Sequence, residues 1–248
     1  MKKTPISNDR IYSEYYSDSE YINLRIRDAK RYVDYIRNRI QITKDSKILE
    51  VGCGTAEFGS VLKQEYGSQV YGIDRNITAI KIARSKGVQA VKGDVEKKWP
   101  FENRKFDVII ASQIIEHIVN TDILFTESQR VLKKNGLLII ATPNLAAWFN
   151  RILLPLGYQP FFTEVSTVDK TLGLDFTRRL TTIRNPLGHL RCFTLRALID
   201  MYRLYNFDVI MAKGASVSYL PKYMSVFDDF FSNFSSLATD LLIVGMRK

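Results

Sequence analysis

The sequence predicts an α/β fold in which a mostly parallel sheet lies between two layers of helices. Short apolar stretches and amphipathic stretches alternate five times over residues 45–142, a pattern typical of such a sheet. Residues 106–111 are nearly all apolar, as in a strand that is buried on both faces. A chain of 248 residues, 46% of them hydrophobic, is long and apolar enough for one substantial core. We therefore expect residues 1–248 to form a single domain.

The expected elements follow in order. Residues 1–42 form an N-terminal helical segment with an amphipathic helix over 21–41. Asn76 is a suitable N-terminal cap, Gly87 ends the helix that Asn76 begins, and Thr194 caps a later helix. The expected helices span 56–66, 76–86, a stretch ending near 134, and 193–205. The seven expected strands span 47–51, 69–73, 88–92, 106–111, 137–141, 207–212 and 240–246.

Two stretches lack the alternation of strand and helix. Residues 143–192 carry four prolines and begin where the fifth strand ends, so we expect an insertion at the carboxyl end of the sheet, where ligands bind. Residues 214–238 form a second insertion that is rich in tyrosine and phenylalanine. These aromatic residues could form the core of a lid or contact a membrane surface.

Composition limits the function classes. The formal net charge is +10, but the basic residues occur as scattered pairs rather than as a run, which favours a solvated basic surface and leaves acidic substrates or RNA open. No apolar run is long enough to span a membrane, and no apolar signal core follows Met1, so the expected location is the cytoplasm. Two cysteines and two histidines at distant positions predict neither a disulfide framework nor a metal cluster.

A Gly-x-Gly turn follows the first strand. Gly52 and Gly54 lack a Cβ and so allow a ligand close to the backbone, and the next helix directs its N–H groups there. Glu50 ends the first strand, and Asp74 lies 20 residues after Gly54, about the spacing at which an acid reaches ribose hydroxyls. Glu57 replaces the third glycine of a dinucleotide fingerprint, which argues against NAD.

The stretch Glu50-Val51-Gly52-Cys53-Gly54-Thr55-Ala56 resembles the acid-x-Gly-x-Gly-x-Gly motif of the class I S-adenosylmethionine-dependent methyltransferases, with Ala56 in place of the last glycine. The resemblance continues in order through 92–96, 106–112, 115–118 and 130–140. It implies a Rossmann-like three-layer sandwich whose last strand is antiparallel and lies between the fifth and sixth. It also implies S-adenosyl-L-methionine as the methyl donor and S-adenosyl-L-homocysteine as the product.

The resemblance also implies the cofactor residues, motif by motif. Backbone groups of the glycine turn would contact the methionine part, Asp74 the ribose and Asp94 the adenine amino group, with Val95 offering its N–H. Ser112 and Gln113 would lie beside the sulfonium. The complete expected set is Glu50, Gly52, Cys53, Gly54, Asp74, Arg75, Asp94, Val95, Ser112 and Gln113.

Candidate residues for catalysis and acceptor binding lie outside these motifs. His117 follows the fourth strand and could act as a general base or brace the next helix. His189 lies in the first insertion, where it could face the substrate or belong to a turn. Arg151 and Arg191 could bind an anionic acceptor, and Tyr16 is a third candidate for substrate binding.

The acceptor stays open at this point. The first insertion resembles bacterial and archaeal methyltransferases found with glycan or lipid-linked sugar synthesis, which favours a small-molecule or glycan-like acceptor methylated at oxygen or nitrogen. RNA methylation is the second hypothesis, supported by charge alone, and no Pro-Cys or Asn/Asp-Pro-Pro-aromatic motif accompanies it. A non-catalytic protein that binds S-adenosylmethionine is the third.

Overall fold

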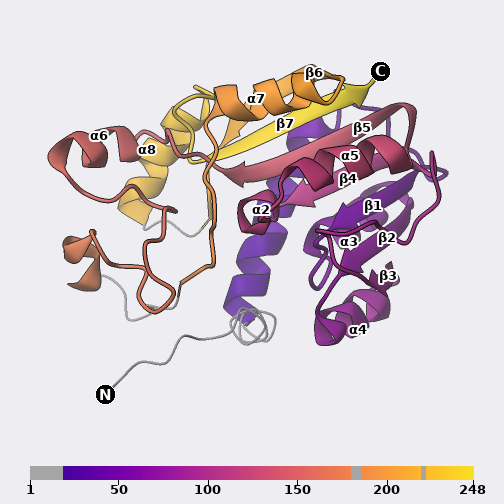
Figure 1. Cartoon of the computed structure of the whole chain (residues 1–248), viewed down its shortest axis with the longest axis horizontal. Coiled ribbons are helices and arrows are strands. Elements are labelled where there is room, and N and C mark those ends of the chain that lie inside the picture. Colours follow the sequence, from indigo (N-terminus) through magenta and orange to yellow (C-terminus); the bar gives the residue numbers. More distant parts are fainter. Residues whose placement is uncertain (1–18, 180–185, 219–221) are drawn as a thin grey trace.

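The computed structural model describes residues 19–179, 186–218 and 222–248. Its centre is a seven-stranded sheet with the strand order β3-β2-β1-β4-β5-β7-β6 (Figure 1). The strands are β1 (Lys47–Val51), β2 (Gln69–Asp74), β3 (Gln89–Lys92), β4 (Phe106–Ser112), β5 (Leu132–Pro143), β6 (Phe207–Ala215) and β7 (Asp240–Arg247).

Strand β7 is antiparallel to both of its neighbours, and the other six strands are parallel to one another. Ile48 of β1 lies opposite Val70 of β2 and Val108 of β4 in parallel register, whereas β7 pairs antiparallel with β5 and β6. The expected mostly parallel sheet, with its last strand inserted antiparallel between the fifth and sixth, is confirmed.

Helices cover both faces of the sheet. Side chains of α2 (Ser19–Ile36), α3 (Glu57–Tyr66) and α4 (Ile77–Ser85) belong to one hydrophobic cluster. Side chains of α5 (Asp122–Val131) and α7 (Leu195–Leu204) belong to a second cluster. The architecture is therefore the expected three-layer sandwich.

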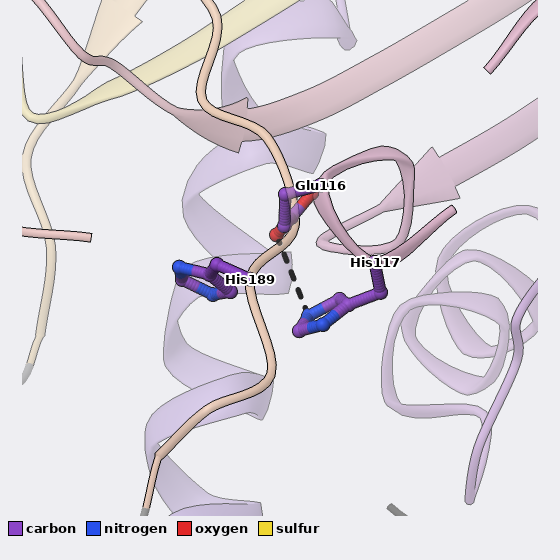
Figure 2. A group of neighbouring side chains, drawn as sticks. All are labelled: Glu116, His117 and His189. Carbon is purple, nitrogen blue, oxygen red and sulfur yellow. Dashed lines mark ion pairs between the residues drawn. The ribbon is translucent and has the colours of Figure 1, made fainter. Parts of the chain in front are cut away.

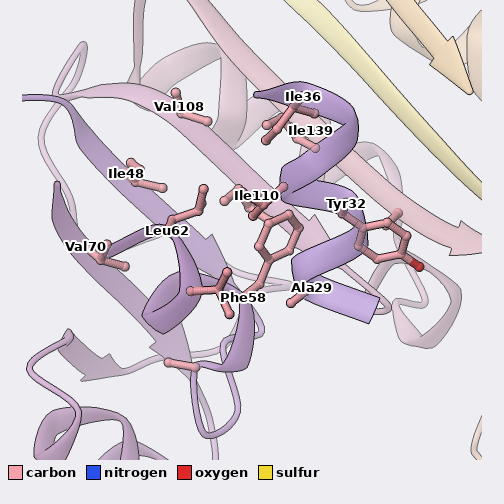
Figure 3. Close-up of a cluster of buried hydrophobic side chains, with 14 of the residues drawn as sticks. Ala29, Tyr32, Ile36, Ile48, Phe58, Leu62, Val70, Val108, Ile110 and Ile139 are labelled. Carbon is pink, nitrogen blue, oxygen red and sulfur yellow. The ribbon is translucent and has the colours of Figure 1, made fainter. Parts of the chain in front are cut away.

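Helix α2 is part of the hydrophobic core. Figure 3 shows Tyr32 and Ile36 of α2 beside Phe58 and Leu62 of α3, against strand residues that include Ile110. The Tyr32 and Phe58 ring centroids are 5.9 Å apart. Each fully buried side chain of this size stabilises the fold by about 1.5–3 kcal/mol. The same packing fixes the position of the helix beside the glycine turn.

The predicted helix caps are confirmed. The Asn76 side chain accepts hydrogen bonds from the backbone N–H groups of Thr78 and Ala79, and Thr194 Oγ1 accepts one from Ala197 N at 3.3 Å. Gly87 has a φ of 77°, a conformation that glycine adopts at little cost after a helix.

The predicted boundaries differ from the structure most clearly at α2, at the helix after β4 and at β5. Helix α2 ends at Ile36 rather than near 41, and the fourth strand is followed by the short 3-10 helix η1 (Ile115–His117) before α5. Strand β5 begins at Leu132 rather than at 137. Its first residues pair irregularly with β4, because Phe106 lies opposite Leu132 and Val108 opposite Leu137, and Asn135 between them has a φ of 61°.

The two insertions lie together at one end of the sheet (Figure 1). The first contains the short helices α6 (Asn150–Leu153), η2 (Leu154–Leu156) and η3 (Asp175–Arg179), and the second contains α8 (Lys222–Ser232). Trp148 stacks on Phe231 at a centroid distance of 5.2 Å, whereas Phe227 and Phe230 are exposed. The aromatic residues of α8 thus serve partly as a core. No helix within the described ranges is long and apolar enough to cross a bilayer.

Candidate active site

A cavity of about 830 Å³ opens at the carboxyl ends of β1, β2 and β4. Its walls come from α2, from the loops after these strands and from the first insertion, so residues far apart in sequence face a common space. All ten residues of the expected cofactor set line this cavity: Glu50, Gly52, Cys53, Gly54, Asp74, Arg75, Asp94, Val95, Ser112 and Gln113.

The glycine turn has left-handed backbone conformations. Gly52 has a φ of 64° and Gly54 a φ of 49°, and Ala56 follows with 59°. Beneath the turn, Glu50 Oε2 accepts a hydrogen bond from Gly59 N at 2.9 Å. Burial raises the pKa of Glu50 to about 8, so this acid is held near its ionisation point at neutral pH.

Asp74 ties the turn to the end of β2. Its Oδ2 accepts a hydrogen bond from Gly54 N at 2.8 Å, and its Oδ1 accepts one from Asn76 N at 2.8 Å. Burial raises its pKa. A carboxylate offers about four acceptor positions, so Asp74 keeps acceptor capacity toward the cavity.

The loop after β3 forms another wall. Asp94 Oδ1 accepts a hydrogen bond from Glu96 N at 3.0 Å, and the carbonyl of Val95 accepts one from Trp99 Nε1 at 3.1 Å. These local bonds fix the loop while both residues face the cavity.

Past β4, Gln113 is bound from two sides. Its backbone, with a φ of 55°, donates to the carbonyl of Ala141 at 2.7 Å, and its Nε2 donates to Asp240 Oδ2 at 2.9 Å. The hydroxyl of Tyr32 donates to the same Asp240 oxygen at 2.6 Å. Burial raises the pKa of Asp240 to about 7. The side chain of Gln113 is thereby positioned at the edge of the cavity.

The two candidate catalytic histidines lie side by side. The rings of His117 and His189 have centroids 4.9 Å apart, and His117 Nε2 is 3.9 Å from Glu116 Oε1. Burial lowers the pKa of His117 to about 3 and also lowers that of His189. Burial raises the pKa of Glu116 to about 8. Both imidazoles are therefore neutral at physiological pH.

Two of the three expected substrate residues, Arg151 and Arg191, lie outside the lining of this cavity. Arg151 donates to the carbonyls of Ala146 at 2.8 Å and Ser236 at 3.0 Å, and Arg191 donates to the carbonyls of Ile118 and Val119. Both guanidinium groups brace loops, and anion binding by Arg151 and Arg191 stays a prediction. Tyr16 lies outside the described residues.

Three residues that line the cavity were not among the candidates predicted from the sequence. Arg25 of α2 reaches Ser112 Oγ at 3.4 Å. In the first insertion, Glu164 accepts hydrogen bonds from the N–H groups that lead to His189, and Lys170 lines the same wall. In the sequence, Arg25 is one of several charged residues that alternate with apolar residues, as on the solvated face of any amphipathic helix. Nothing in this pattern distinguishes Arg25 from the neighbouring charged residues.

Comparisons with known proteins bear on the family and the fold of the chain. A family model described as a methyltransferase domain matches residues 42–167. The chain is 34% identical over 131 residues to a ubiquinone biosynthesis O-methyltransferase of Pelagibacter ubique, an alignment that covers 49% of this chain and 53% of the relative. It is 30% identical to a demethylmenaquinone methyltransferase of Staphylococcus carnosus, over 54% of this chain and 56% of the relative.

The chain thus spans about half the length of these curated relatives. Among solved structures, a methyltransferase of Thermotoga maritima superimposes with a TM-score of 0.62 at 19% identity, and the alignment covers 97% of this chain and 98% of that one. At this identity the likeness concerns the fold.

Proposed function

The chain belongs to the S-adenosylmethionine-dependent methyltransferases, and we propose that it transfers a methyl group to an oxygen or nitrogen of a small-molecule or glycan-like acceptor. The observation that carries this proposal is one cavity that joins the expected cofactor residues to the first insertion and to both histidines. Donor and acceptor can therefore share one enclosed space.

The residues present fit the cofactor, which when bound supplies an activated methyl group on a sulfonium. The cofactor carries positive charge on its sulfonium and ammonium groups, and the buried acids Glu50, Asp74 and Asp240 face the cavity. Its carboxylate needs a cation, and Arg25 is available on α2. The cavity thus offers a group of opposite charge for each charged group of the cofactor.

We assign roles within that set. Gly52, Cys53 and Gly54 would contact the methionine part through their backbone, with Glu50 toward its ammonium group and Arg25 toward its carboxylate. On the nucleoside side, Asp74 would accept from the ribose hydroxyls, Asp94 and Val95 would bind adenine, and Arg75 would close the wall beside them. Ser112 and Gln113 would lie at the sulfonium.

The volume and walls of the cavity favour a small acceptor. Sites for small molecules occupy about 300–1,000 Å³, and the cavity of about 830 Å³ falls in that range. Beyond the cofactor residues its walls include Phe161, Phe162 and Leu187, which suit an acceptor with an apolar or ring-shaped body. The names of the relatives, a ubiquinone biosynthesis O-methyltransferase and a demethylmenaquinone methyltransferase, support small-molecule methylation.

The same proposal assigns the segments. Residues 45–142 would hold the cofactor, helix α2 would cover it, and 143–192 would enclose the acceptor. No described residue of 214–238 lines the cavity, so this segment would support the first insertion, where Phe231 stacks on Trp148. Both cysteines are free thiols, which fits a reducing compartment, and we propose the cytoplasm.

Titration calorimetry with S-adenosylhomocysteine tests the cofactor site. We expect the wild-type protein to bind, and Asp74→Ala to lose about 1.5–3 kcal/mol, or about tenfold to hundredfold in affinity, because charge-assisted hydrogen bonds are removed. Asp200→Ala, which removes an exposed acid that pairs with Arg203 on the same helix, is the matched control and should bind like wild type. A folded wild-type protein that does not bind would refute the proposal.

A transfer assay tests the acceptor. Formation of S-adenosylhomocysteine would be followed with panels of hydroxylated ring compounds, sugars and amines, and with RNA in parallel. Turnover with RNA alone would overturn the small-molecule proposal. Cofactor binding without turnover on any panel would favour the non-catalytic alternative.

A further inference from the structure

Both histidines of this chain meet at one buried glutamate. The sequence contains two histidines, separated along the chain, and the fold places His117 and His189 around Glu116 (Figure 2). Glu116 and His117 belong to η1, whereas His189 comes from the end of the first insertion. One ligand atom from each of the three residues lies within 4.8 Å of the others. The sequence predicted no metal cluster because the two histidines are far apart along the chain. The fold brings them together, so that argument no longer applies.

One carboxyl oxygen of Glu116 is buried without a hydrogen-bond donor among the described residues. Glu116 is 1% exposed, and its Oε2 accepts a hydrogen bond from Thr142 Oγ1 at 2.9 Å. Its Oε1 is buried and, within the part of the chain that the structure describes, has no hydrogen-bond partner. A buried carboxylate oxygen without a donor is costly. A cation bound beside Oε1 would offset that cost.

Backbone carbonyls orient both imidazoles. His117 Nδ1 lies 3.0 Å from the carbonyl oxygen of Gly188, and His189 Nδ1 lies 3.1 Å from that of Phe162. Because a carbonyl oxygen only accepts, each Nδ1 carries the proton and each Nε2 carries the lone pair. Histidine ligands of metal ions are oriented in this way, through a hydrogen bond from the other ring nitrogen.

We propose that Glu116, His117 and His189 form a binding site for a divalent transition-metal ion of the zinc type. Two imidazoles and one carboxylate are the ligands of zinc in several hydrolytic enzymes and suit Fe²⁺ and Co²⁺ as well, whereas Mg²⁺ and Ca²⁺ prefer oxygen ligands alone. Ligands of a tetrahedral ion with bonds of about 2.0–2.1 Å stand about 3.4 Å apart. Small side-chain rotations close the gap from 4.8 Å.

The location of the site indicates what the ion would do. All three residues line the same cavity as Ser112 and Gln113, and three protein ligands leave a fourth position open. An acceptor hydroxyl at that position would lose its proton to water, and its oxygen would take the methyl group while the electron pair of the breaking C–S bond stays on sulfur. This role rests on the proposed function, whereas the ion site itself does not.

The experiment is a titration of chelator-treated protein with Co²⁺, followed by visible absorption, and with Zn²⁺, followed by calorimetry. We expect one saturable site per chain and the absorption of a low-coordinate Co²⁺ complex. His189→Gln and Glu116→Gln should each weaken binding by about tenfold or more. Cys192→Ser is the matched control, because this thiol lies beside Phe162 near the cluster and is the competing soft ligand; it should bind Co²⁺ like wild type.

Binding of S-adenosylhomocysteine is measured on the same samples, and unfolding curves verify that each variant is folded. Wild-type protein that binds S-adenosylhomocysteine but takes up neither ion refutes the metal site and leaves the proposed function standing. The metal site is also refuted if both His189→Gln and Glu116→Gln still take up the ion, or if Cys192→Ser no longer does. Ion uptake at the three residues without any cofactor binding supports the site and refutes the proposed function.

Discussion

Replacing Glu50 with glutamine should stabilise the protein and weaken its cofactor binding at the same time. Glu50 is buried at the end of β1, where its Oε2 accepts a hydrogen bond from the N–H of Gly59 at 2.9 Å. Glutamine is neutral and nearly isosteric, and its amide oxygen can still accept from Gly59. The substitution therefore removes the charge and keeps the packing.

The magnitude follows from the pKa of Glu50, which burial raises from 4.5 to about 8. A raised folded-state pKa means that the folded state holds its proton longer than the unfolded state. The stability is then fully present below pH 4.5 and is lost as the pH rises toward 8. At 1.36 kcal/mol per pKa unit the loss amounts to about 3–5 kcal/mol. Glu50→Gln lacks this loss, so it should lie within about 1 kcal/mol of wild type near pH 5 and exceed it by about 3–5 kcal/mol near pH 8.

The assay is chemical denaturation of wild type and Glu50→Gln across pH 5–8.5 without cofactor. Other buried acids contribute equally to both proteins and cancel in the difference. Glu65→Gln, which removes an acid that pairs with Arg37 at the surface, is the control and should run parallel to wild type. Parallel curves for Glu50→Gln would refute the argument from burial.

Cofactor affinity gives the second readout of Glu50→Gln. If the ionised carboxylate faces the ammonium group of the methionine part, the variant should bind S-adenosylhomocysteine about 1.5–3 kcal/mol more weakly at pH 8. Equal affinity of the two proteins would refute the role that we assign to Glu50. Gain of stability with loss of binding would show that the fold carries this acid for its ligand.

Two further predictions concern the same region. Gly59→Ala should destabilise the fold by about 1–3 kcal/mol, because a Cβ there would lie 2.6 Å from Glu50 Oε2 and 2.8 Å from Val70 Cγ1. Chemical denaturation measures the loss, and an unchanged denaturation midpoint would contradict the prediction. Tyr32→Phe removes the 2.6 Å hydrogen bond to Asp240, whose pKa is about 7, so the cost should be larger at pH 8, where the carboxylate is ionised, than at pH 6. A cost that does not depend on pH would mean that Asp240 does not titrate in this range.

Local sequence patterns predicted the features that depend on local chemistry. The cap at Asn76 requires only a side-chain oxygen one position before a helix, and the glycine turn requires left-handed conformations at Gly52 and Gly54. The antiparallel position of β7, by contrast, was not readable from its residues. It came from resemblance to a known family, because strand pairing across the sheet depends on the whole topology.

Contacts between distant segments could not be predicted in this way. His117 and His189 meet because Glu164 holds the chain ahead of His189, and no periodicity links these positions. Arg151 and Arg191 looked like anion ligands because guanidinium groups in loops often are, yet each bonds to backbone carbonyls. Whether a guanidinium is used within the fold or left for a ligand depends on which carbonyls the loops leave unpaired.

The lining of the cavity is rich in acids, although the chain as a whole is basic. The net charge is +10, and this was the one observation in favour of RNA. Within the cavity, however, burial raises the pKa of four acids: Glu50, Asp74, Glu116 and Asp240. A cation that binds beside them stabilises their ionised form and is attracted at short range and low polarity, whereas an anion gains nothing from them. The surface charges are distant and screened by salt. The cavity therefore favours cationic ligands, such as the cofactor and the proposed metal ion, over a polyanion.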